Sequence, residues 1–300
     1  MVRRTDLAVE AHQLWMESAA DAPLPKGIAV TEREREGFAV SAVTITDSAG
    51  AQALGKPMGR YVSLELEGLL RREQDAFQRA TAAIAAELRE LFTFTDSAPV
   101  LVVGLGNRAV TPDLLGPLAA EHILVTRHLV KGAPEHFGHY RPVSALIPGV
   151  LASTGIESAE IAAAVSGAAK PAAVIVIDAL ASRATERVCK TVQLSDSGIA
   201  PGSGVGNHRA AIDRATMRVP VLSVGVPTVV DGATLALDIL AQAGLKEPEP
   251  EALGGQGADL FVTPREIDVQ VATLSKAIGY GINLALHPAL TLSDLEMLLE

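Results

Sequence analysis

Two uninterrupted apolar runs constrain the fold of this chain more than any other feature. One covers residues 100–103 and leads through a glycine-rich loop to Asp113, and the other covers residues 173–177 and leads directly to Asp178. Strands of a parallel sheet read as continuous apolar runs because helices cover both faces, and such sheets bind ligands beyond the carboxyl ends of their strands. We therefore expect Asp113 and Asp178 to lie in one crevice and to carry the chemistry.

Strand and helix patterns alternate along most of the chain. The expected strands cover residues 101–105, 142–147, 172–177 and 219–226, and the expected helices cover residues 71–92, 114–124, 157–169, 232–243, 267–286 and 293–300. This alternation predicts an α/β fold with a mostly parallel twisted sheet flanked by helices. Alternating β-branched segments at 38–46 and 60–66 predict extra N-terminal strands that are antiparallel or lie at an edge.

Length and composition favour one large core. The chain has 300 residues, 48% of them hydrophobic, and α/β sheets often use such a length in one domain. We expect a single α/β domain over residues 1–300, with residues 1–70 as a peripheral N-terminal segment. The stretch 246–259 is rich in Pro, Glu and Gly and predicts a mobile surface loop.

Net charge and cysteine content limit the binding partners that we expect and the cellular compartment of the protein. A net charge of −10 argues against direct nucleic-acid binding, which needs clustered Lys and Arg. The one cysteine, Cys189, cannot form an internal disulfide, and the first residues lack an apolar signal sequence, so we expect a cytoplasmic protein. Cys189 has no paired histidine and is expected to pack rather than to react. No apolar stretch reaches the roughly 20 residues of a membrane span.

The loop after the first apolar run contains residues suited to a sharp turn followed by the start of a helix. Gly104 and Gly106 allow a sharp turn, and the side chain of Asn107 is suited to hydrogen-bonding loop amides. Thr111, followed by a proline, matches the N-cap and first position of a helix, which puts Asp113 in the first turn. There the helix dipole favours the carboxylate and lowers its pKa, unless another negative group lies close. The alternative is that Asp113 only supports the start of the helix.

Asp178 is harder to explain by local structure. It follows an apolar strand directly, so a central position in the sheet would remove water from its carboxylate. Burial raises the pKa of a carboxyl group, and a second carboxylate nearby raises it further. Two acids with separated pKa values can divide the work, one as an ionised base that activates water and one as a protonated acid. The alternative is an aspartate that caps the next turn.

Three further polar residues are candidates for substrate binding or loop shaping. Ser203 lies in the glycine-rich stretch 201–207, which lacks the Lys-Ser/Thr ending of a phosphate-binding loop and is better explained as a substrate-shaping or structural loop. Arg183 is placed to pair with Asp178, to meet an acidic substrate side chain, or to form a plain surface salt bridge. Asp231 is a third acidic candidate, better explained as a helix-start residue.

Histidines at three positions raise the question of a metal. His128, His136 and His139 lie around a connection punctuated by Gly and Pro, where no regular element fixes their spacing. Solvated loop histidines explain them best. We expect no metal and no other cofactor.

Eight segments of the chain resemble, in order, landmarks of the spore germination proteases, a family of endopeptidases from spore-forming bacteria. The segments are Arg4-Thr-Asp-Leu-Ala-Val-Glu-Ala, Gly59-Arg-Tyr-Val, Val102-Val-Gly-Leu-Gly-Asn, Val110-Thr-Pro-Asp-Leu-Leu-Gly-Pro, Ile177-Asp-Ala-Leu-Ala-Ser-Arg, Pro201-Gly-Ser-Gly-Val-Gly-Asn, Pro227-Thr-Val-Val-Asp and Val262-Thr-Pro-Arg-Glu-Ile-Asp. Together they cover nearly the whole chain.

The resemblance implies a homotetrameric endopeptidase, a phosphorylase/hydrolase-like fold and a location in the cytoplasm of the forespore or spore core. Its implied substrates are the small acid-soluble spore proteins, whose degradation it initiates at germination. The family's two catalytic aspartates correspond to Asp113 and Asp178. A distant similarity to the hydrogenase-maturation endopeptidases, which bind nickel through acidic residues, implies an alternative: a nickel- or zinc-dependent endopeptidase. The glycine-rich loops alone leave a third reading, a nucleotide-binding module.

Two departures from the family pattern accompany the resemblance. The family is typically made as a zymogen whose short propeptide is cut just before a segment like residues 2–8, and this sequence begins there. We therefore expect that the propeptide is missing or that the sequence is the mature form. The family's long insertion before its final helices is reduced here to residues 246–259.

Overall fold

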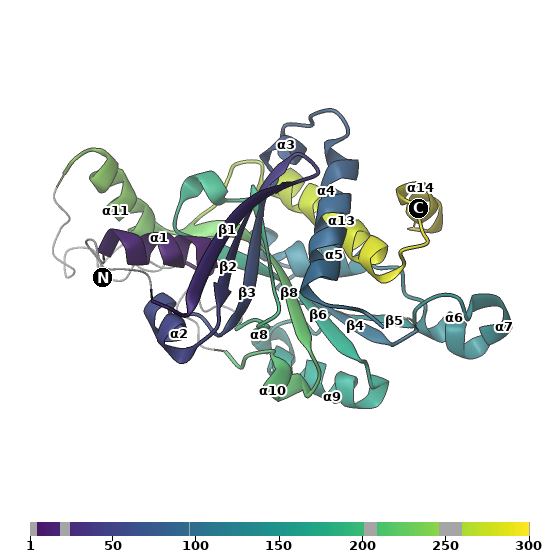
Figure 1. Cartoon of the computed structure of the whole chain (residues 1–300). Helices are drawn as coiled ribbons and strands as arrows, with labels where there is room; N and C mark the ends of the chain where they lie inside the picture. The colour runs from purple at the N-terminus through teal and green to yellow at the C-terminus, as the bar shows by residue number, and fades with distance from the viewer. Residues whose placement is uncertain (1–4, 19–24, 96, 201–208, 246–259, 300) are drawn as a thin grey trace.

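A large mixed sheet forms the centre of the molecule (Figure 1). The computed structural model describes residues 5–18, 25–95, 97–200, 209–245 and 260–299. Within these residues the sheet has nine strands in the order β1-β2-β3-β7-β8-β6-β4-β5, and β9 pairs with β8. The strands are β1 (Ile28–Arg35), β2 (Phe38–Ile45), β3 (Gly59–Glu65), β4 (Val100–Gly104), β5 (Val143–Leu146), β6 (Ala173–Ser182), β7 (Thr191–Ser195), β8 (Val221–Asp231) and β9 (Phe261–Val262).

The parallel part of the sheet contains both apolar runs. Strands β8, β6, β4 and β5 pair side by side in parallel. Residues of β4 alternate between two cores: Val100 and Val102 face one, and Leu101 and Val103 face the other. Both faces are therefore buried, which is why these strands read as unbroken apolar runs. The α/β fold is confirmed.

The antiparallel part extends the sheet on the other side of β8. Strands β2 and β3 confirm the expected N-terminal antiparallel strands, and β1 and β7 enlarge this part beyond the expectation. The second half of β1 is Thr-Glu-Arg-Glu-Arg, whose charges hide the strand pattern. Its pairing with β2 starts from a tight turn in which Glu36 and Gly37 have φ values of 52° and 76°, as a two-residue hairpin requires.

Helices cover the two faces of the parallel part (Figure 1). The long helix α13 packs on both α4 and α5 over one face, and α9 and α10 cover the other. The helices are α1 (Ala8–Ser18), α2 (Ser48–Leu54), α3 (Glu67–Leu70), α4 (Ala76–Leu91), α5 (Leu115–Glu121), α6 (Arg127–Gly132), α7 (Pro134–Phe137), α8 (Leu151–Thr154), α9 (Ser158–Ala169), α10 (Arg214–Met217), α11 (Gly232–Gln242), α13 (Ile267–Leu286) and α14 (Leu292–Leu299), with 3₁₀ turns η1 (Thr111–Asp113) and η2 (Thr185–Arg187).

The histidine-bearing connection is more regular than the sequence indicated. It forms the short helices α6 and α7, so the expectation of an irregular connection is wrong there. His136 and His139 are exposed. Among the residues that the structure describes, no group of three or more His, Cys, Asp or Glu is arranged to hold a metal ion.

Two further expectations concern membrane spans and the predicted surface loop. In the described part of the chain, no helix is long and apolar enough to cross a membrane. The predicted mobile loop, residues 246–259, lies outside the described residues.

Candidate active site

Asp113 and Asp178 line the same cavity, of about 290 Å³, at the carboxyl end of β4. Helix α5, which follows Asp113, packs on both β4 and β6, and these neighbouring parallel strands thereby bring the two aspartates together. The two carboxylates are close enough for the charge of Asp113 to raise the pKa of Asp178. The structure thus places the two residues as the sequence led us to expect.

Asp178 does not end its strand, and this expectation is corrected. Strand β6 continues to Ser182, and Asp178 pairs with Gly225 of β8. Strand β4 is the shorter neighbour, because it ends at Gly104, opposite Ile177. Asp178 therefore lies one residue beyond the end of β4, where the sheet opens to the cavity. The strand continues because Ala-Leu-Ala-Ser after the aspartate is as compatible with a buried strand as the run before it.

The Asp178 carboxyl group is almost fully buried, with 5% of the residue exposed. Burial raises its pKa well above the ordinary value of 3.8, and the charges of Asp113 and Asp6 raise it further. Its Oδ1 accepts a hydrogen bond from the backbone N–H of Ala179 at 3.0 Å. Among the described residues this one donor compensates little for the lost water, so the protonated form is favoured.

Asp113 ends the 3₁₀ turn η1, just before α5 begins. Thr111 makes no side-chain capping bond, so its expected role as N-cap is wrong. The Oδ2 of Asp113 accepts a hydrogen bond from the backbone N–H of Asn107 at 2.7 Å, while Asn107 Oδ1 accepts one from Ala109 N at 2.9 Å. Burial raises the pKa of Asp113, and the lowering expected of a helix start held only with no other negative group close by, whereas Asp178 shares this cavity. Asp113 is half-buried, and thus less desolvated than Asp178.

Glycines allow the two backbone segments of this loop to touch. Gly106 has a φ of +133°, and a Cβ there would lie 2.0 Å from the carbonyl oxygen of Asp113. A Cβ on Gly104 would lie 2.2 Å from the carbonyl oxygen of Gly116. Side chains at either position would push η1 and α5 away from β4. The close backbone approach at Gly104 and Gly106 and the hydrogen bond from the Asn107 amide therefore position Asp113.

Two charged residues in the cavity were missed by the sequence reasoning. Asp6 lies there because its backbone N–H donates to Ala181 O at 2.8 Å and its Oδ2 accepts from Ala181 N at 2.9 Å. Arg209 lines the same cavity, and its charge lowers the pKa of both Asp113 and Asp178. The only sequence signal was position: Asp6 lies in a landmark segment, and Arg209 lies two residues after the end of another.

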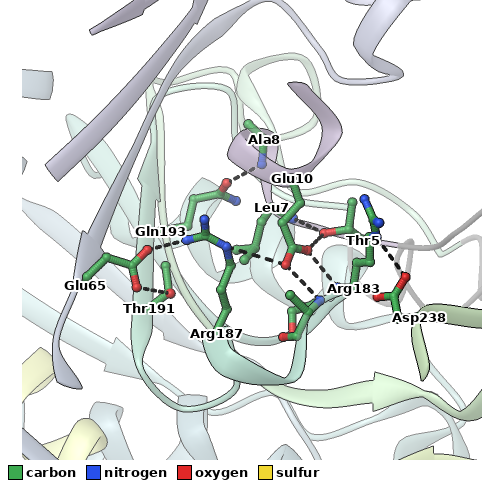
Figure 2. A network of polar contacts seen from close by, with 12 residues as sticks. Thr5, Leu7, Ala8, Glu10, Glu65, Arg183, Arg187, Thr191, Gln193 and Asp238 are labelled. Atoms are coloured by element: carbon green, nitrogen blue, oxygen red, sulfur yellow. Dashed lines mark hydrogen bonds and ion pairs between the residues drawn. The ribbon is translucent and has the colours of Figure 1, made fainter. Parts of the chain in front are cut away.

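A buried network attaches the N-terminal segment to the end of β6 (Figure 2). Glu10, 1% exposed, accepts hydrogen bonds from the backbone N–H groups of Arg183 at 2.7 Å and Ala184 at 3.0 Å, and from the Thr5 hydroxyl. Gln193 Oε1 accepts from Ala8 N at 2.7 Å. Residues 5–11 are therefore integral to the core beside the cavity, and the expectation of a peripheral segment is wrong for them.

The remaining candidates from the sequence lie elsewhere. Arg183 forms ion pairs with Glu17 at 2.9 Å and Asp238 at 3.3 Å, and not with Asp178 (Figure 2 shows Asp238). Asp231 caps α11 by accepting from the backbone N–H of Thr234 at 2.9 Å, which is the helix-start role, and it does not line the cavity. Ser203 lies outside the described residues.

The donor set of the cavity fits acid–base chemistry better than nickel or zinc binding. Its described lining contains three carboxylates and one arginine but neither histidine nor cysteine. Nickel and zinc sites in proteins are dominated by imidazole and thiolate ligands. A cation that lowers the carboxyl pKa values also competes with a bound metal ion for the same oxygens.

Comparison with known proteins identifies the family of the chain. A family model described as germination protease matches residues 8–247. The chain is 43% identical to the germination protease of Caldanaerobacter subterraneus subsp. tengcongensis, over 99% of this chain and 98% of that one. It is 38% identical to that of Clostridium tetani, over 99% of both chains, and 37% identical to that of Bacillus cytotoxicus, over 95% and 93%. The chain therefore belongs to the germination protease family of peptidases.

Proposed function

We propose that this protein is an endopeptidase that initiates the degradation of small acid-soluble spore proteins during germination, using Asp113 and Asp178 to activate water. The observation that carries the proposal is the pair of carboxyl groups of unequal burial that share one cavity. Family membership supports the reaction class. The same membership supports a homotetramer in the cytoplasm of the forespore or spore core as the working form.

Unequal burial assigns the two acids different roles. Asp178, with the more strongly raised pKa, holds the proton, and the less buried Asp113 is ionised. Asp113 accepts a proton from a water molecule whose oxygen adds to the scissile carbonyl carbon, while the carbonyl π electrons move to oxygen. The C–N bond then breaks and the leaving nitrogen takes a proton from an acid of the pair. One water is consumed, and one carboxyl group and one amine are released.

The walls of the cavity suit a peptide substrate. Its apolar side chains include Val110, Val150 and Phe261, and two of these, Val110 and Phe261, are 44% and 47% exposed. Exposed apolar side chains at the rim of a site gain free energy when a substrate side chain covers them. The carboxyl pair thus lies at the bottom of a cavity whose mouth can bind apolar residues of a protein substrate.

Incubation with a purified acid-soluble spore protein tests the proposal. The protein is expected to cut that substrate at a small number of sites, identified by mass spectrometry, both without and with a chelator such as EDTA. Loss of cutting with chelator, restored by nickel or zinc, would favour the metal-dependent alternative. Absence of any cutting by folded protein would contradict the proposed function.

A further inference from the structure

Arg209 lines the same cavity as the reacting pair. Among the described residues that line the catalytic cavity, it is the one with a positive charge. The backbone nearby is fixed, because Ile199 and Ile212 exchange two hydrogen bonds, of 3.0 and 2.8 Å. Ile212 is fully buried in the core under β4 and β6. Arg209 therefore extends from a position three residues before an anchored bridge.

The charges in the cavity give this arginine a defined environment. Three aspartates, Asp6, Asp113 and Asp178, share the cavity with it, and its charge acts on both proposed catalytic carboxyl groups. A guanidinium group stays charged in proteins and carries five N–H donors. In a site shielded from water, a cation and donors of this kind stabilise negative charge more strongly than they do in bulk water.

The proposed hydrolysis requires such a group. When water adds to the scissile carbonyl, negative charge develops on the carbonyl oxygen, and Asp113 and Asp178 are occupied with proton transfer. Of the other polar side chains in the described lining, the hydroxyl of Ser158 donates to Gly149 O at 2.8 Å, Asp6 is an acceptor, and Thr228 offers only a neutral hydroxyl. Much of the rest of the lining is apolar.

We propose that Arg209 is a third catalytic residue, whose guanidinium donates hydrogen bonds to the carbonyl oxygen of the scissile peptide as negative charge develops there. This inference rests on the proposed peptidase function. Arg209 forms and breaks no covalent bond: the oxygen gains the carbonyl π electrons during attack and returns them when the C–N bond breaks. A second consequence is that the arginine keeps Asp113 ionised to lower pH than burial alone would allow.

The variants Arg209→Gln and Arg209→Lys test the proposal, with Arg214→Gln as a matched control on the exposed surface of α10. Loss of an oxyanion donor lowers kcat by about 100- to 1,000-fold. Because this donor acts in the transition state, we expect Arg209→Gln to show that loss with KM changed by no more than about threefold. Arg209→Lys should recover part of kcat, and Arg214→Gln should match the parent protein.

The pH dependence of kcat separates a catalytic role from a structural one. Removing the positive charge raises the pKa of Asp113, so the acidic limb of the profile should move to higher pH in Arg209→Gln and stay near its original position in Arg209→Lys. A folded Arg209→Gln protein with near-parental kcat, or with an unshifted acidic limb, would overturn the inference. If Arg209→Gln does not fold, Arg209→Lys decides: a low kcat that added guanidinium does not change would also overturn it.

The two proposals fail in different ways. If Asp113→Asn and Asp178→Asn remain active while folded, the proposed function fails. If those two variants are inactive and Arg209→Gln is fully active, only the assignment of Arg209 fails.

Discussion

Substitution of Gly106 by alanine provides a sharp test of how Asp113 is held. The new Cβ would lie 2.0 Å from the carbonyl oxygen of Asp113, whereas ordinary contact begins at 3.4 Å. The two atoms must therefore separate by about 1.4 Å, and both belong to backbone that cannot rotate away. The φ of +133° adds backbone strain of about 1–3 kcal/mol.

The expected effect on activity follows from this displacement. A misplacement of about 1 Å in a catalytic group lowers the rate by on the order of 100-fold, so Gly106→Ala should lose at least that factor in kcat. The assay is cleavage of an acid-soluble spore protein, expressed per folded molecule from circular dichroism.

A matched control for this variant is Gly55→Ala. Gly55 also has a positive φ, +61°, but a Cβ there meets nothing within 4 Å. The control should lose about 1 kcal/mol of stability and keep its activity. A folded Gly106→Ala protein with activity within about threefold of the parent would refute the claim that close backbone approach positions Asp113.

Three further predictions concern buried groups. Asp178→Asn should raise the free energy of unfolding at pH 7.5, because the raised pKa of Asp178 in the native state makes its ionisation destabilising. The protonated aspartate stabilises the fold fully below the ordinary pKa of 3.8, and this stabilisation is lost as pH rises through the native-state pKa. The gain in stability, measured by urea unfolding, should therefore vanish near pH 4, and a loss of stability at both pH values would contradict the prediction. Glu10→Ala leaves the backbone N–H groups of Arg183 and Ala184 without their acceptor and should cost about 2–5 kcal/mol in urea unfolding, whereas an effect below about 0.5 kcal/mol would show that the network does not hold the N-terminal segment. Cys189 is buried and burial raises its pKa to about 12, so iodoacetamide should modify it only after unfolding; rapid modification of native protein would contradict its burial.

The central sheet could be predicted from the sequence because its signal is local. Residues 100–104 and 173–177 are apolar at every position or glycine, and short runs rich in Val and Ile are typical of strands buried on both faces. The N-cap role of Asp231 followed equally from its local sequence. The extent of β6 could not be predicted, because the end of a strand beside a site depends on where its neighbour β4 stops.

Long-range packing explains what the sequence concealed. Strand β7 is inserted between β3 and β8, and no local pattern states which strands will be neighbours. Asp6 reaches the cavity because its own bonds to Ala181, with those of Glu10 and Gln193, fix residues 5–11 against β6 and β7. The direction of the Asp113 pKa shift depends on the same packing, because burial by distant segments outweighs the local effect of a helix start.

The sequence alone left open whether the two aspartates share a proton or bind a metal ion, and the residues that line the cavity bear on this choice. Aspartates at the ends of neighbouring strands suit both a proton-sharing pair and a metal site. The described lining, with Arg209 and without histidine or cysteine, favours the proton-sharing pair.

Cleavage of an acid-soluble spore protein by Asp113→Asn and by Asp178→Asn, each measured beside the exposed control Asp75→Asn, tests the central claim most directly. Asparagine keeps the shape of aspartate but can neither accept the proton of water nor donate one as an acid. We expect both variants to fold and to lose at least about 1,000-fold in kcat, while Asp75→Asn matches the parent. Near-parental turnover by either folded variant would contradict it.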